Sequence, residues 1–156
     1  MMSRVKNGIL AGLAATAVVS VLEAVNLYML KLTDPFPAVV AAMVGAPGNL
    51  AVGWTVHMIM GIVVLGIAFA YLYDRLPTKT PAAKGIAFAV GAWVLMMVYV
   101  TMVIPQARAL PSGGGTIIAW MLATHAIFGV VLGTVYNRLL QRDRAHTPPV
   151  GAAPAH

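Results

Sequence analysis

The sequence predicts an all-α protein in which four transmembrane helices form a bundle. Of the 156 residues, 60% are hydrophobic and only 9% are charged, whereas a soluble domain carries about 25% charge. Four apolar stretches each reach the roughly 20 residues that a membrane helix needs. They run over residues 8–30, 51–73, 82–104 and 116–139. With so few charged side chains, lipid is the solvent in which this chain is expected to fold.

The first span is not expected to be a cleaved signal peptide. Its apolar stretch is longer than a signal core, and it holds Glu23 and Asn26 where small residues would precede a cleavage site. The connection after this span contains the segment PFPAVVAAMVGAP. This segment predicts a short helix that begins near Pro37, because proline is tolerated in a first helical turn. Gly45 and Pro47 would end it, and we expect it at the outer interface of the bilayer.

Lysine and arginine residues predict how the spans are oriented. Two precede the first span, three lie between the second and third, and three follow the fourth, but the other two connections hold one each. The cytoplasmic side takes the excess of basic residues, so both termini are expected in the cytoplasm. The same placement accounts for the net charge of +6 without a nucleic-acid partner. Trp54 and Trp120, near span ends, are expected to anchor the protein at the membrane interface.

The chain is expected to form one membrane domain over residues 1–144, followed by a disordered tail over 145–156. Within the membrane domain, pairs of spans share short motifs. The second span holds HMIMGIVVLG from His57, and the fourth holds HAIFGVVLG from His125. The first and third open on KNGILAG and AKGIAFAVG. These matches predict two similar helical hairpins in tandem, related by an axis near the membrane normal.

Four polar side chains inside the predicted spans need an explanation. Glu23 and Asn26 continue the helical face of the GxxxG motif that opens the first span. His57 and His125 each share a face with a glycine four residues further on, so both point to a neighbouring helix. At 1.5 Å of rise per residue, these groups fall in the outer half of the membrane. The bundle is therefore predicted to hold a carboxyl, an amide and two imidazoles at one level.

Ionisable groups inside a membrane are costly and are functional hypotheses by default. One interpretation is structural: Glu23 hydrogen-bonds to a histidine and fixes the packing of the bundle. Such a bond contributes about 0.6–2 kcal/mol in a membrane protein.

A second interpretation is a cofactor site. Histidines from two facing helices, here His57 and His125, can ligate haem b or a metal, and Glu23 could orient one of the imidazoles. The absence of cysteine excludes thiolate ligands and disulfides.

A third interpretation is a small proton-linked transporter centred on Glu23, with the histidines relaying protons near neutral pH. A complete path would have to cross the cytoplasmic half of the bundle. That half is apolar apart from Thr16 and Ser20.

The chain resembles a group of uncharacterised small bacterial inner-membrane proteins, the YagU-like proteins. The resemblance covers about the first 140 residues, and its motifs are short and rich in glycine. The residues that carry it are Gly53, Trp54 and His57 in the second span and His125, Gly129, Gly133 and Tyr136 in the fourth. It implies a four-helix protein of the bacterial inner membrane and supplies no activity, substrate or cofactor.

The leading functional hypothesis is a non-enzymatic membrane protein. It would act as an accessory or structural partner of other membrane subunits or of a second copy of itself, within the lipid bilayer. The alternatives are the haem- or metal-binding protein that uses His57 and His125, and the transporter centred on Glu23.

Overall fold

The computed structural model describes residues 2–33, 35–103 and 114–145, and within them it confirms the all-helical fold. The elements in chain order are α1 (Met2–Val25), η1 (Asn26–Leu30), α2 (Phe36–Met43), α3 (Leu50–Met58), η2 (Ile59–Leu65), α4 (Gly66–Leu72), α5 (Pro81–Val103) and α6 (Gly114–Ala145). The labels η1 and η2 mark π-helices. The expected tail lies outside the described residues, except for Ala145 at the end of α6.

Within the described ranges, four helical stretches are long and apolar enough to cross a membrane. The first joins α1 to η1, and the second joins α3, η2 and α4 without a break. α5 and α6 are the third and fourth. All four coincide with the predicted spans. α1 begins earlier and α6 ends later than the apolar pattern predicts, because polar residues extend both helices beyond their apolar segments.

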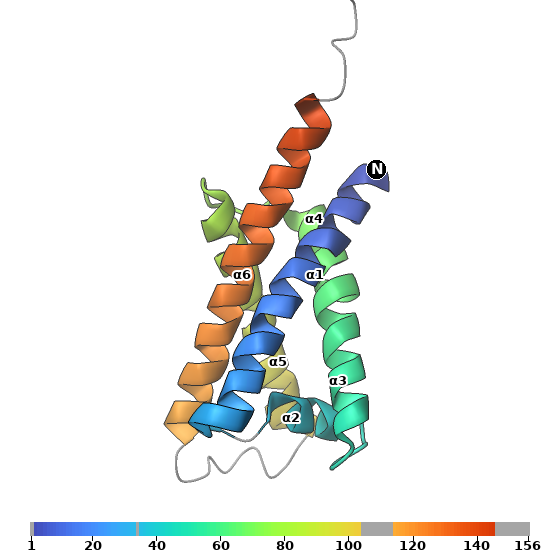
Figure 1. Ribbon diagram of the computed structural model, residues 1–156. Helices are drawn as coiled ribbons and strands as arrows, with labels where there is room; N and C mark the ends of the chain where they lie inside the picture. Colours follow the sequence, from blue (N-terminus) through green and yellow to red (C-terminus); the bar gives the residue numbers. More distant parts are fainter. Residues whose placement is uncertain (1, 34, 104–113, 146–156) are drawn as a thin grey trace, which may run out of the picture.

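The segments that carry most of the basic residues share one end of the bundle. Figure 1 shows the N-terminus, the connection between α4 and α5, and the C-terminal end of α6 at this terminal end. α2 and the start of α3 lie at the opposite end, here called the α2 end. Two spans separate each basic segment from the next, so these segments return to the same end of the bundle. The orientation prediction requires this arrangement.

Glycines bring the two helices of each hairpin into backbone contact. A Cβ added at Gly8 would meet the carbonyl oxygen of Gly66, and one at Gly12 would lie 2.7 Å from a carbonyl oxygen of η2. In the second hairpin, a Cβ added at Gly85 would meet the carbonyl oxygen of Gly129. Small residues permit this close approach in membranes. The glycine face predicted for α1 is therefore a real packing face, while the duplication of the hairpin stays a prediction.

A buried aromatic core fills the terminal half of the bundle. The ring of Phe69 on α4 lies 5.2 Å from that of Phe88 on α5 and 5.4 Å from that of Tyr136 on α6, between centroids. The ring of Tyr73 lies 4.9 Å from that of Tyr136. Aromatic pairs at such distances stabilise a fold beyond the area that they bury. This core joins the two hairpins at the terminal end.

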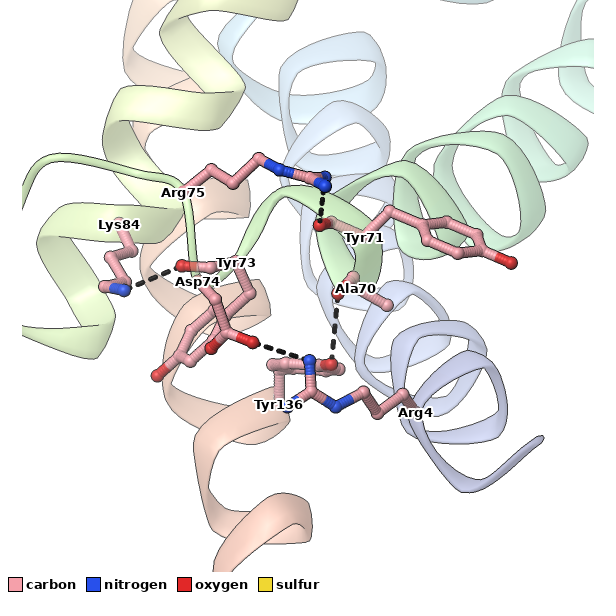
Figure 2. A network of polar contacts seen from close by, with 8 residues as sticks. All are labelled: Arg4, Ala70, Tyr71, Tyr73, Asp74, Arg75, Lys84 and Tyr136. Atoms are coloured by element: carbon pink, nitrogen blue, oxygen red, sulfur yellow. Dashed lines mark hydrogen bonds and ion pairs between the residues drawn. The ribbon is translucent and has the colours of Figure 1, made fainter. Parts of the chain in front are cut away.

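Polar contacts hold the connection between α4 and α5 in place, as Figure 2 shows. Arg4 pairs with Asp74 at 2.6 Å, and the Lys84 ammonium donates to the carbonyl of Tyr73 at 2.7 Å. The hydroxyl of Tyr136 donates to a carbonyl of α4 at 3.4 Å. The ion pair is exposed on both sides and contributes about 0–1 kcal/mol. These contacts fix the position of the connection more than they add to stability.

The short helix predicted in the first connection is α2, and it packs against the bundle. It begins at Phe36, one residue before the predicted start, and ends at Met43, before Gly45. Pro37 is fully buried. A Cβ added at Gly53 of α3 would meet the carbonyl oxygen of Pro37, so only glycine allows this approach. α2 is thus an integral part of the bundle, and its depth at the outer interface stays a prediction.

Candidate functional site

A cavity of about 510 Å³ lies at the α2 end, bounded by α1, α2, α5, α6 and the second span. Its lining is largely apolar. Three of the four polar residues singled out in the sequence, Glu23, His57 and His125, line it. An apolar pocket of this size with a few convergent polar groups is the usual form of a small-molecule site. The structure therefore brings the predicted carboxyl and the two imidazoles to one space.

Exposed residues on α5 and η2 form part of the lining of the cavity. Leu95 on α5 lines the cavity and is 73% exposed, and Met60 on η2 lines it and is 43% exposed. Both residues lie inside apolar stretches long enough to span a bilayer. α5 packs mainly on α6, while the second span packs on α1 and α2. The mouth of the cavity is therefore surrounded by lipid-compatible surface.

Glu23 is buried, with only 4% of its surface exposed, and its two carboxylate oxygens join three helices. Oε1 accepts the backbone N–H of Phe36 at 2.7 Å, and Oε2 accepts the indole N–H of Trp120 at 3.3 Å. Phe36 opens α2, whose N-cap residue, Pro35, provides no side-chain cap. Glu23 thus supplies from another helix the acceptor that a helix N-terminus lacks, and its negative charge suits the helix dipole.

Asn26 serves the backbone and does not line the cavity. It is fully buried, its amide nitrogen donates to the hydroxyl of Thr33 at 2.9 Å, and its carbonyl oxygen accepts the N–H of Leu32 at 3.1 Å. The turn that it holds includes Lys31, which has a φ of 50°. A left-handed backbone at a residue other than glycine needs such support. Asn26 therefore stabilises the reversal that leads into α2.

The two histidines line the cavity in similar surroundings but form different hydrogen bonds. His125 Nδ1 lies 2.7 Å from the carbonyl oxygen of Met121. A carbonyl can only accept, so Nδ1 carries the proton and Nε2 is left as an acceptor. His57 Nε2 lies 3.4 Å from the hydroxyl of Ser20. The Phe36 ring packs edge-to-face on both imidazoles, with centroids 5.7 Å from His57 and 6.4 Å from His125.

A family model matches residues 2–147, nearly the whole chain. The chain belongs to DUF6789, a family of unknown function. No curated protein and no solved structure matches it. The resemblance to YagU-like proteins stays a prediction beside this finding.

The structural interpretation placed a histidine as the partner of Glu23, and this DUF6789 chain uses a different partner. Among the described residues, the hydrogen bonds of Glu23 go to Phe36 and Trp120. The physical reason is that the N-terminus of α2 presents an N–H group that its N-cap residue, Pro35, does not cap. A polar clasp is present at the predicted place, but it joins α1 to α2 and α6.

The haem or metal interpretation, which needs only His57 and His125, stays a prediction. Within the part of the DUF6789 chain that the structure describes, no group of three or more His, Cys, Asp or Glu side chains lies close enough to hold a metal ion. The Phe36 ring packs on both His57 and His125. A group held by both histidines would therefore share its space with the Phe36 ring.

Several lining residues were not predicted as part of the site. Trp54 and Trp120, which were expected to be interface anchors, line the cavity. The ring of Trp54 packs edge-to-face on His57 with centroids 5.7 Å apart. Phe36 enters because α2 folds against α3. In the GWxxH motif of the second span, Trp54 and His57 lie three residues apart on one helical face. This motif could have revealed Trp54 as a lining residue.

Proposed function

We propose that this protein is a non-enzymatic accessory protein of the bacterial inner membrane that holds a small lipophilic molecule in the cavity at the α2 end. Both termini face the cytoplasm in this proposal, as the distribution of basic residues favours. The observation that carries the proposal is the cavity itself, about 510 Å³ in volume, mainly apolar, and lined by Glu23, His57 and His125. Pockets of about 300–1,000 Å³ accept drug-sized ligands.

The lateral mouth supports a ligand that arrives from the bilayer. Leu95 and Met60 are exposed at the rim and lie within membrane-spanning stretches. A molecule dissolved in lipid would enter without crossing a polar surface. The partner of the accessory role, other membrane subunits or a second copy of the chain, belongs to the proposal as well.

The aromatic core favours a binding protein over a proton-linked transporter. Between the cavity and the terminal end, the interior holds Phe69, Phe88, Leu132 and Tyr136, all of them buried. Thr16, buried against Gly61, has a hydroxyl without a hydrogen-bond partner in the described part of the chain. Among the described residues this interior is mainly apolar and aromatic, which disfavours a proton path from Glu23 to the terminal end.

Saturable binding of a neutral lipophilic fluorophore tests the proposal. N-phenyl-1-naphthylamine would be titrated into protein reconstituted in lipid nanodiscs, with empty nanodiscs as the background. Energy transfer from the tryptophans, two of which line the cavity, reports on the bound fraction. We expect one saturable site per chain. A signal no greater than that of empty nanodiscs would overturn the proposal.

A matched pair of variants on α5 locates the site. Ala92 lines the cavity, and Ala92→Phe would fill part of it; Val94 lies outside the lining and is 46% exposed. We expect Ala92→Phe to abolish the saturable signal and Val94→Phe to keep it, with helical circular dichroism confirming that both fold. Equal binding by the two variants would place the fluorophore elsewhere.

A further inference from the structure

The described lining of the cavity holds one negatively charged group and no positively charged one. Among the described residues that line it, Glu23 carries the only full charge, and no lysine or arginine is present. Both oxygens of Glu23 accept N–H donors, as an ionised carboxylate does. Two donors use about half of the roughly four acceptor positions of a carboxylate. A negative group with spare acceptor capacity therefore lies against an apolar space.

Aromatic rings provide much of the remaining electrostatic character of the site. The rings of Phe36, Trp54, Tyr99 and Trp120 all line the cavity. The face of an aromatic ring carries negative electrostatic potential and attracts cations, most strongly where water is excluded. The hydroxyl of Tyr99 is engaged with the carbonyl of Met43 at 3.2 Å, which holds the ring at the rim.

His125 adds an acceptor to this arrangement. Because His125 donates its Nδ1 proton to Met121, the Nε2 atom of the neutral imidazole accepts. The Thr124 hydroxyl donates to the same carbonyl at 3.0 Å, so its proton is also occupied. The lining thus offers a ligand a carboxylate, an imidazole acceptor and aromatic rings. They complement a ligand that brings positive charge or N–H donors.

We propose that the ligand class of this cavity is a lipophilic organic cation, such as an apolar amine or a quaternary ammonium or phosphonium ion, recognised by Glu23 and the surrounding aromatic rings. This inference rests on the proposed function, since it needs the cavity to bind a lipophilic molecule. It adds the sign of the charge and the group that reads it. The apolar lining takes the body of the ligand, and the carboxylate provides the counter-charge that a cation needs inside a membrane.

Two lipophilic ions of opposite charge and nearly equal shape test the inference. Tetraphenylphosphonium and tetraphenylborate would be titrated into nanodiscs with and without the protein, following quenching of tryptophan fluorescence. Empty nanodiscs correct for the different partition of the two ions into lipid. We expect the protein to bind the phosphonium ion about tenfold more tightly than the borate. Equal binding of both ions, or tighter binding of the borate, would overturn the inference.

The variant Glu23→Gln assigns the preference to the carboxylate. Glutamine keeps an acceptor for the N–H of Phe36 but removes the charge. We expect the preference for the phosphonium ion to fall to less than about a quarter of its value, while N-phenyl-1-naphthylamine still binds. Asp74→Asn is the matched control, because Asp74 is an exposed carboxylate at the terminal end, away from the cavity lining. It is expected to leave both measurements unchanged.

The outcomes separate this inference from the proposed function. Binding of the neutral fluorophore without a preference between the two ions would leave the proposed function standing and overturn the cation assignment. Loss of binding of all three probes by the wild-type protein would overturn both. A Glu23→Gln protein that folds and keeps the full preference would also refute the role of Glu23. If that variant does not fold, the wild-type comparison of the two ions still decides the sign of the charge.

Discussion

Glu23 shows how one ionisable side chain can be both a structural contact and part of a binding surface. Its oxygens accept from Phe36 at the start of α2 and from the indole of Trp120. Charge-assisted hydrogen bonds of this kind are stronger than neutral ones. The carboxylate therefore fixes the wall of the cavity while it still faces the interior. Asn26, only three residues further along the chain, is structural alone because its partners all belong to the turn that follows α1.

Removing the Glu23 carboxylate is expected to destabilise the α2 end. Glu23→Ala leaves the N–H groups of Phe36 and Trp120 without an acceptor, and each unsatisfied buried donor costs about 1–3 kcal/mol. We expect the free energy of unfolding to fall by at least about 1 kcal/mol, measured by denaturant titration in detergent with helical circular dichroism. Glu23→Gln should lose less, because its amide oxygen still accepts. Equal losses in the two variants would show that charge, and not the acceptor, matters here.

At the scale of elements, glycine sets the distance between neighbouring helices. Gly8 faces α4, Gly12 faces η2, and Gly85 faces Gly129 and Gly133 on α6. The contacting atoms are backbone atoms, which cannot rotate away as a side chain could. A methyl group at such a position would push the helices apart along their whole crossing.

Gly85→Ala is accordingly expected to weaken the packing of α5 on α6. Overpacking of a tight contact costs about 1–3 kcal/mol, and the unfolding free energy of the variant in detergent should fall by that amount. Gly91→Ala is the control on the same helix, since an added Cβ there meets nothing within 4 Å. It should leave stability unchanged or slightly higher, because alanine favours helix over glycine. A Gly85→Ala protein as stable as the control would contradict the packing argument.

The π-helix η2 lies where the glycine spacing of the second span is one residue longer than that of the fourth. Gly61 and Gly66 are five positions apart in the second span, whereas Gly129 and Gly133 are four positions apart in the fourth. In a π-helix, hydrogen bonds join residue i to i+5, so one extra residue fits into the turn. Such turns are frequent at functional sites, and η2 lines the cavity through Met60.

Deleting Val63 from η2 is expected to convert it to regular α-helix with little effect on the rest of the bundle. The flanking segments would keep their faces, because the deletion removes the residue that the π-turn absorbs. Deleting Val94 from the regular helix α5 would instead turn the following residues by about 100°. The midpoint temperature of thermal unfolding should therefore fall much further for the Val94 deletion than for the Val63 deletion. The reverse order would contradict the role of η2 as a one-residue insertion.

At the scale of the whole molecule, the described fold places both ends of the chain and the connection between α4 and α5 at one end of the bundle. Most of the basic residues lie there. The positive-inside rule then predicts that this end faces the cytoplasm. The cavity at the α2 end would consequently lie in the outer half of the membrane.

Cysteine labelling in intact cells tests this orientation, since the natural sequence has no cysteine. Pro47 at the α2 end and Gln141 at the terminal end are both exposed. We expect a membrane-impermeant maleimide to label Pro47→Cys in intact spheroplasts and Gln141→Cys only after lysis. Labelling of Gln141→Cys in intact spheroplasts would reverse the orientation.

The spans, the glycine faces and the polar positions were predictable because each depends on the chain alone. Hydropathy and length define a membrane helix, and helical spacing places Gly12, Thr16 and Glu23 on one buried face. The hydrogen-bond partners of Glu23 were not predictable, because they depend on how α2 folds back over α3. The cavity was not predictable for a related reason: its volume reflects how far α5 and η2 separate, which no periodicity records. Trp120 reaches Glu23 only once these elements are in place.

The exposed position of Leu95 at the rim of the cavity has a consequence for how ligands compete. A molecule that enters from the side reaches the protein from the lipid phase, where each methylene group enriches it by about 0.8 kcal/mol relative to water. Four additional methylenes raise its local concentration on the order of two-hundredfold. Two compounds with equal intrinsic affinity would then differ widely in potency when doses are counted in water. The bilayer would act as a first filter of specificity, and the protein would choose among the molecules that have already dissolved in it.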